Sequence, residues 1–230
     1  MAHEFAHALT AYSLGLRSTL FHYYTNIDFT SPDPSPRVLI AMAGPVFSLI
    51  FGLVCWLVYR KTRLKPAKLP WLYLAILGIS IFLGNLFAAS FAGDFGTAAT
   101  ILNVDPTIRL VMTILGLALS SAFMYAMGQE LVKWSPPGSS RAAAITSMIA
   151  WPALLGTVLV ILAFLPLPVQ FMAGWLATSL FWLFAAGGAS LASEYATGGG
   201  NLRTRPVEYL AAAVALAAVR ILVAGASLAP

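Results

Sequence analysis

The chain has 230 residues, of which 60% are hydrophobic and only 9% are charged, and its formal net charge is +5. A soluble protein carries about 25% charged residues, so this chain has too few to cover a water-facing surface, and most of its outside must contact lipid. The basic residues do not alternate with aromatic residues along a stripe, which excludes the pattern typical of nucleic-acid binding. The composition therefore predicts an integral membrane protein.

Apolar runs long enough to cross a bilayer recur along the chain. Six are long, at 38–59, 70–92, 108–128, 142–165, 169–193 and 207–228, and a shorter seventh occupies residues 1–16. Between the first two runs in chain order, residues 16–30 are rich in β-branched and aromatic residues, which predicts a short hairpin. We therefore expect an all-α polytopic membrane protein with about six to seven transmembrane helices and a β-hairpin-like insertion after the first.

Charged and aromatic residues between the runs indicate how the chain lies in the membrane. A basic segment defined by Arg60, Lys61, Arg63, Lys65 and Lys68 predicts a cytoplasmic loop under the positive-inside rule. Aromatic residues near run ends predict anchors at the membrane–water interface, and these are Trp71, Trp134, Trp151, Trp175 and Tyr209. Glu130 and Glu194 also lie at run ends, where headgroup water can solvate them. The single cysteine, Cys55, excludes an intrachain disulfide.

The run at 1–16 is short for a membrane span, since a helix rises only about 1.5 Å per residue and the hydrocarbon core is about 30 Å thick. It also lacks the basic start and the cleavage site of a signal peptide. We therefore expect the natural protein to begin upstream of this segment.

Within that run, His3-Glu4-Phe5-Ala6-His7 forms an HExxH motif. On a helix the two histidines face the same way, so that one metal ion can accept a nitrogen from each. A catalytic zinc ion has three protein ligands and one open position, and a carboxylate at Glu4 can take a proton from an attacking water and return it to a leaving amine. The motif predicts peptide-bond hydrolysis, with helix capping or polar packing as the alternative role of the histidines.

Asp94 is the candidate for the third ligand. It lies in an otherwise uncharged segment between Gly84 and Gly96, where a carboxylate is costly unless a proton, a cation or a metal neutralises it. The alternative is an aspartate that caps a helix or lies at the membrane edge. The remaining histidine, His22, adjoins two tyrosines and is interpreted as interfacial.

Three segments of the chain together resemble one family, the site-2 protease group of intramembrane zinc metalloproteases (peptidase family M50). They are His3-Glu4-Phe5-Ala6-His7-Ala8-Leu9 followed by Gly15, then Ala43-Gly44-Pro45-Val46-Phe47-Ser48, and finally Asn85 to Gly96. The resemblance covers about the first hundred residues. Ser48 stands where the family often has asparagine, the stretch 88–92 lacks the usual prolines, and Phe95 separates Asp94 from Gly96.

By this resemblance, zinc would be bound by His3, His7 and Asp94, and Glu4 would be the catalytic acid and base. Asn85 would orient the substrate backbone or polarise the scissile carbonyl. Residues 1–103 would form the metalloprotease core, and 104–230 would add transmembrane helices of unassigned role.

The leading hypothesis is an intramembrane zinc endopeptidase that cleaves a membrane-protein or peptide substrate in or near a transmembrane segment, in the cell membrane and without nucleic-acid partners. One alternative is a transporter or permease with a cation or proton site made of His3, Glu4 and Asp94. Another is a zinc-binding membrane scaffold without catalysis. The sequence does not indicate an oligomeric state.

Overall fold

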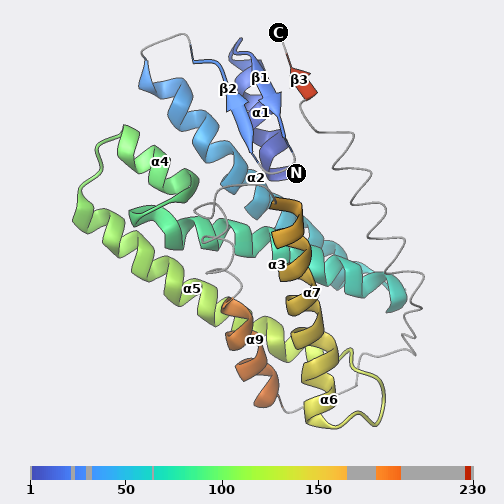
Figure 1. Ribbon diagram of the computed structural model, residues 1–230. Coiled ribbons are helices and arrows are strands. Elements are labelled where there is room, and N and C mark those ends of the chain that lie inside the picture. The colour runs from blue at the N-terminus through green and yellow to red at the C-terminus, as the bar shows by residue number, and fades with distance from the viewer. Residues whose placement is uncertain are drawn as a thin grey trace.

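The computed structural model describes residues 2–21, 24–29, 33–63, 65–164, 180–192 and 226–228. Figure 1 shows the elements, which are α1 (Ala2–Ser13), β1 (Ser18–Leu20), β2 (Thr25–Ile27), α2 (Pro34–Lys61), α3 (Lys65–Phe87), the 3-10 turn η1 (Ala88–Ser90), α4 (Gly93–Ile101), α5 (Pro106–Val132), α6 (Arg141–Ile145), the π-helical turn η2 (Thr146–Ala150), α7 (Trp151–Phe164), α9 (Phe181–Ser190) and β3 (Ala226–Leu228). The described part of the chain is therefore mainly helical, with one small sheet.

Four segments of the described chain are helices long and apolar enough to cross a membrane, namely Pro34–Lys61, Lys68–Ser90, Pro106–Val132 and Arg141–Val158. They support an all-α protein embedded in a membrane. The predicted count of six to seven is higher than the count in the described residues, because α1 has 12 residues and α9 has 10. Residues 169–179 and 193 of the run 169–193, and residues 207–225 of the run 207–228, lie outside the described residues, and 226–228 form a strand.

Two of the long helices begin with the same local signal. Asp33 precedes α2 and accepts a hydrogen bond from the backbone N–H of Ser35, at 2.9 Å, while Asp105 precedes α5 and accepts one from the N–H of Thr107, at 2.7 Å. In both cases proline follows at the first helical position, where its missing N–H costs nothing. These caps fix where α2 and α5 enter the bundle.

Helices α2 and α3 pack closely against each other. A Cβ on Gly52 would lie 2.6 Å from the backbone nitrogen of Ile79, and a Cβ on Gly78 would lie 2.7 Å from Cα of Gly52. The link between them is shorter than the predicted basic loop, because α3 already begins at Lys65. As a result, the Lys68 ammonium lies over the Tyr59 ring, 5.4 Å from its centroid.

The predicted hairpin is present as β1 and β2, which pair antiparallel. Strand β3 pairs antiparallel with the other edge of β1, so the strand order is β2-β1-β3 and β2 has one free edge within the described sheet. The sheet lies beside α1 (Figure 1). His22 falls between the strands at a position outside the described residues.

Away from the sheet, the far ends of α2 and α5 are joined by a polar cluster. The Tyr59 hydroxyl donates a hydrogen bond to the carboxylate of Glu130, Lys133 Nζ donates to the second carboxylate oxygen at 2.9 Å, and the indole N–H of Trp134 donates to the Tyr59 oxygen at 3.4 Å. The interpretation of Trp134 as an interfacial anchor is wrong, because this side chain is only 5% exposed and packs in the main apolar core. Protein groups, rather than headgroup water alone, hold Glu130.

We expect Tyr59→Phe to lower the free energy of unfolding by about 1–3 kcal/mol, because it leaves the Glu130 carboxylate without its hydroxyl donor and keeps the ring. Chemical unfolding of the purified chain in detergent measures this change. The matched control is Tyr125→Phe on α5, whose side chain is 37% exposed and which should unfold like the parent. Equal stability of the two variants would contradict a stabilising role for the cluster.

Candidate metal centre

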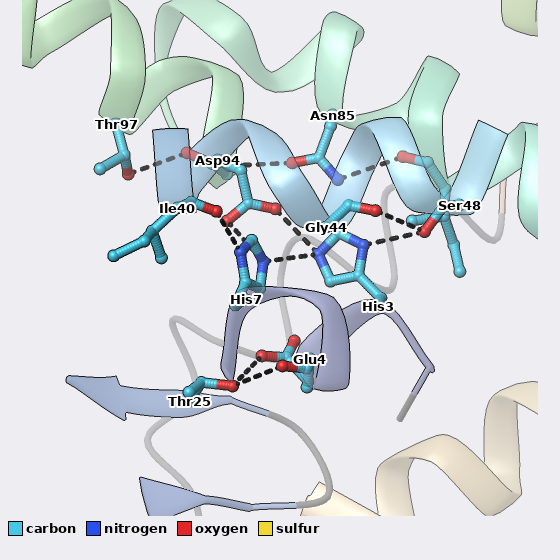
Figure 2. A network of polar contacts seen from close by, with 12 residues as sticks. His3, Glu4, His7, Thr25, Ile40, Gly44, Ser48, Asn85, Asp94 and Thr97 are labelled. Atoms are coloured by element: carbon cyan, nitrogen blue, oxygen red, sulfur yellow. Dashed lines mark hydrogen bonds and ion pairs between the residues drawn. The ribbon is translucent and has the colours of Figure 1, made fainter. Parts of the chain in front are cut away.

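Helices α1 and α4 both pack against α2. His3 and His7 of α1 and Asp94 of α4 therefore meet at one place, as Figure 2 shows. The Nε2 atoms of the two histidines lie 3.2 Å apart. Asp94 Oδ2 lies 2.9 Å from Nε2 of His3, and Asp94 Oδ1 lies 3.6 Å from Nε2 of His7. The structure thus brings together the three residues that the sequence predicts as metal ligands.

The outer nitrogen of each imidazole has a partner on α2. Nδ1 of His7 donates to the backbone carbonyl of Ile40 at 2.6 Å, and a carbonyl can only accept, so this nitrogen carries the proton. Nδ1 of His3 lies 3.0 Å from the hydroxyl of Ser48, whose own hydrogen is donated to the carbonyl of Gly44 at 2.9 Å. Nδ1 of His3 is then the donor as well, so each imidazole presents its Nε2 toward Asp94, as a lone pair when the ring is neutral and as an N–H when it is protonated.

This donor set fits a zinc ion. Two imidazole nitrogens and a carboxylate lie close together, with one possible ligand atom of each residue within 4.8 Å of the others. Donors on a tetrahedral zinc with bonds of about 2.0–2.1 Å are about 3.3 Å apart. The two Nε2 atoms are 3.2 Å apart, one oxygen of Asp94 lies 2.9 Å from Nε2 of His3, and the other oxygen lies 3.6 Å from Nε2 of His7. Imidazole together with carboxylate also suits zinc better than magnesium or calcium, which prefer oxygen ligands.

The electrostatics of the three side chains agree with a cation site. Burial opposes ionisation of Asp94, but hydrogen bonds from His3 and His7 outweigh it and hold the pKa of the Asp94 carboxyl well below its usual value. Burial likewise opposes a charged His7, yet its hydrogen bond to Asp94 and the charges of Asp94 and Glu4 raise the pKa of the His7 imidazole. The carboxylate thus keeps its negative charge and, when no metal is bound, favours a proton on the His7 imidazole.

The backbone around Asp94 is held by two neighbours. Gly93 has φ of +73°, a conformation that side chains with a Cβ rarely adopt, and it begins the short helix α4. The backbone N–H of Asp94, in the first turn of that helix, donates to Oδ1 of Asn85 at 2.9 Å. Since the first N–H groups of a helix have no partner within it, Asn85 supplies the missing acceptor from α3.

Asn85 is predicted from the family resemblance to bind substrate. In the structure its Nδ2 donates to the carbonyl of Ile81 at 3.1 Å, while its Oδ1 receives the N–H of Asp94 (Figure 2). The side chain therefore supports a metal ligand. Its role toward substrate stays a prediction.

Glu4 follows His3 in the chain and is not one of the three grouped residues. Figure 2 shows it beside Thr25 of β2, whose hydroxyl lies 2.9 Å from the backbone oxygen of Glu4 and 3.3 Å from Oε2 of its carboxylate. This threonine is a site residue that sequence reasoning missed. It links the hairpin to the predicted catalytic carboxylate.

Three further contacts of the site come from one helical face of α2. Ile40 supplies a carbonyl, Ser48 a hydroxyl, and Gly44 the space between them, since a Cβ on Gly44 would lie 2.3 Å from Nε2 of His7. The spacing 40, 44, 48 is that of neighbouring turns on one side of a helix. The four-residue spacing of Gly44 and Ser48, a glycine and a small polar residue on one side of an apolar helix, is the sequence signal that could have indicated these contacts.

Comparison of the chain with family models, with curated proteins and with solved structures found no match. The function is therefore inferred from the residues of the site.

Proposed function

We propose that this protein is an intramembrane zinc endopeptidase of the site-2 protease type, with His3, His7 and Asp94 as zinc ligands and Glu4 as the acid and base. One observation carries the proposal: His3 and His7, each with its Nδ1 bonded to α2, present Nε2 beside the Asp94 carboxylate, so that one ligand atom of each residue lies within 4.8 Å of the others. Bound zinc would supply Lewis acidity, which makes water more acidic and stabilises negative charge on a carbonyl oxygen.

The proton transfers of the reaction would be carried out by side chains of the protein. Glu4 follows His3 directly on α1, and by the family resemblance its carboxylate would act on a water held at the cluster. Its carboxylate would accept the proton of that water and return it to the leaving nitrogen. The hydroxyl of Thr25 would hold Glu4 in place by the bond it donates.

The substrate would be an extended segment of a membrane protein or peptide. A transmembrane helix has no free backbone groups, so it must unwind locally before a carbonyl can be attacked. Strand β2 offers an unpaired edge within the described sheet, and its Thr25 contacts Glu4. A substrate strand that pairs with β2 would pass beside the catalytic carboxylate.

The first test is the ratio of zinc to protein, measured by elemental analysis on the detergent-purified chain. We expect about one zinc per chain, and we expect it to be lost or much weakened in His7→Ala and Asp94→Ala because each removes one of three ligands. Asp33→Ala, which removes an aspartate from the exposed cap of α2, is the matched control and should keep its zinc.

A folded parent chain that binds no zinc after reconstitution would overturn the proposal. It would favour the transporter reading, in which the same residues hold a proton or another cation. Bound zinc without cleavage of any peptide would favour the scaffold reading. By the same proposal the protein acts in the cell membrane as a multi-pass protein.

A further inference from the structure

One face of α5 carries polar and small residues, although the rest of the helix is apolar. Arg109, Thr113 and Gly116 follow one another at spacings of four and three residues, which places them on one side of the helix. Its other faces carry large apolar side chains that are exposed on the surface of the protein, among them Ile108, Leu110, Val111, Ile114 and Leu115. The polar face contacts the segment that leads to Asp94.

At the middle of this face, Thr113 binds the turn η1 twice. Its hydroxyl donates to the hydroxyl of Ser90 at 2.8 Å and accepts the backbone N–H of Ser90 at 3.1 Å. One helical turn further on, the backbones of α5 and α3 touch, because a Cβ on Gly116 would lie 2.2 Å from the nitrogen of Phe87. The end of α3 and the turn after it are therefore fixed on α5.

Arg109 extends this contact to both sides of Asp94. Its Nε donates to the carbonyl of Ala89 at 3.3 Å, before the aspartate. Its Nη2 donates to the hydroxyl of Thr100 at 3.1 Å and lies 3.5 Å from the carbonyl of Gly96, both after the aspartate. The planar guanidinium has several donors in a fixed arrangement, so one side chain joins the two limbs of the segment.

We propose that Arg109 and Thr113 are positioning residues that set the place of the Asp94 carboxylate in the metal centre. Neither side chain touches the three donor atoms, and both act through the backbone of residues 89–96. The inference rests on the proposed zinc site, and it gives α5 a role in that site although α5 lies outside the segment that resembles a protease core.

The test uses the full chain in detergent and Co²⁺ as the probe, because the visible absorption of bound cobalt reports the identity and geometry of its ligands. Arg109→Gln and Thr113→Val should each weaken Co²⁺ affinity about tenfold, the lower end of the effect of removing support from a metal ligand, and should alter the absorption bands. Thr113→Ser keeps the hydroxyl and should restore both.

Two control variants lie outside the contact. Arg63→Gln removes an exposed charge at the far end of α2, and Ser121→Ala removes a hydroxyl on α5 that bonds only its own helix, at the carbonyl of Leu117. Both should bind Co²⁺ like the parent. Hydrogen exchange of the backbone amides at 88–96 is measured on every variant, with and without metal, and should be faster in Arg109→Gln and Thr113→Val.

The outcomes separate this inference from the proposed function. Unchanged hydrogen exchange at 88–96 in folded Arg109→Gln would overturn the inference. If the parent binds metal, the inference would also be overturned by a variant whose exchange is faster but whose cobalt spectrum and affinity equal those of the parent. If the parent binds neither Co²⁺ nor Zn²⁺ while exchange at 88–96 still rises, the zinc function fails and the hold of α5 on the Asp94 segment is supported.

Discussion

Gly44→Ala should weaken zinc binding roughly 100-fold or more without unfolding the helix that carries it. A Cβ at this position would lie 2.3 Å from Nε2 of His7 and 2.7 Å from Nε2 of His3, where ordinary contact begins at 3.4 Å. The two ligand nitrogens would have to move by about 1 Å, whereas metal–ligand distances tolerate only about 0.2 Å. Alanine therefore takes the volume in which the imidazoles present their lone pairs.

The change cannot be explained by a weaker helix, because alanine favours a helix interior over glycine by about 0.5–1 kcal/mol. Gly156→Ala on α7 is the matched control, since nothing lies within 4 Å of its added Cβ. Zinc titration against a competing chelator, with thermal unfolding in parallel, measures both variants. If folded Gly44→Ala binds zinc as tightly as the parent does, the metal does not lie between the Nε2 atoms of His3 and His7.

The sequence alone could predict the parts of the site that depend on local spacing or on charge. The interval from His3 to His7 places two imidazoles on one side of any helix, whatever packs around it. Asp94 is distinctive because a carboxylate in an uncharged segment requires compensation. The structure brings this aspartate to the same two imidazoles.

The supporting contacts could not be predicted in this way, because they depend on which helix faces take part in packing. Ser48 is 45 residues from His3 in the chain, and Arg109 is 20 residues from Ala89. A hydropathy profile also does not detect the break at η1, because Ala88 and Ala89 in the turn and Phe91 after it are apolar like the helix before them. The run 70–92 therefore merges α3 with the turn that leads to Asp94.

The position of a residue within an apolar run of the sequence also does not predict whether its side chain is buried. Trp134 lies just after α5, where an anchor in the headgroup region is the usual expectation. Trp134 instead belongs to the same buried core as residues of η2 and α9, among them Met148, Ile149 and Phe181. Which run ends are covered is decided by helix–helix packing, and local sequence does not record it.

Glu4→Gln should leave about one zinc per chain and reduce cleavage by about 100- to 10,000-fold, the range for loss of a general acid and base. The amide has nearly the shape of the carboxylate, and it can still accept the hydrogen bond from Thr25. It cannot take a proton from water. The metal should be retained because the three donors come from His3, His7 and Asp94.

The assay follows a pool of single-span peptides, reconstituted in vesicles with the full chain, and identifies products by mass spectrometry. Glu130→Gln makes the same chemical change at the other end of the bundle, where Tyr59 and Lys133 hold the carboxylate, and it should cleave like the parent. If Glu4→Gln loses zinc together with activity, Glu4 supports the metal centre rather than moving protons. If Glu4→Gln cleaves at the parent's rate, another group of the chain must accept the proton, and the HExxH glutamate would have no catalytic role here.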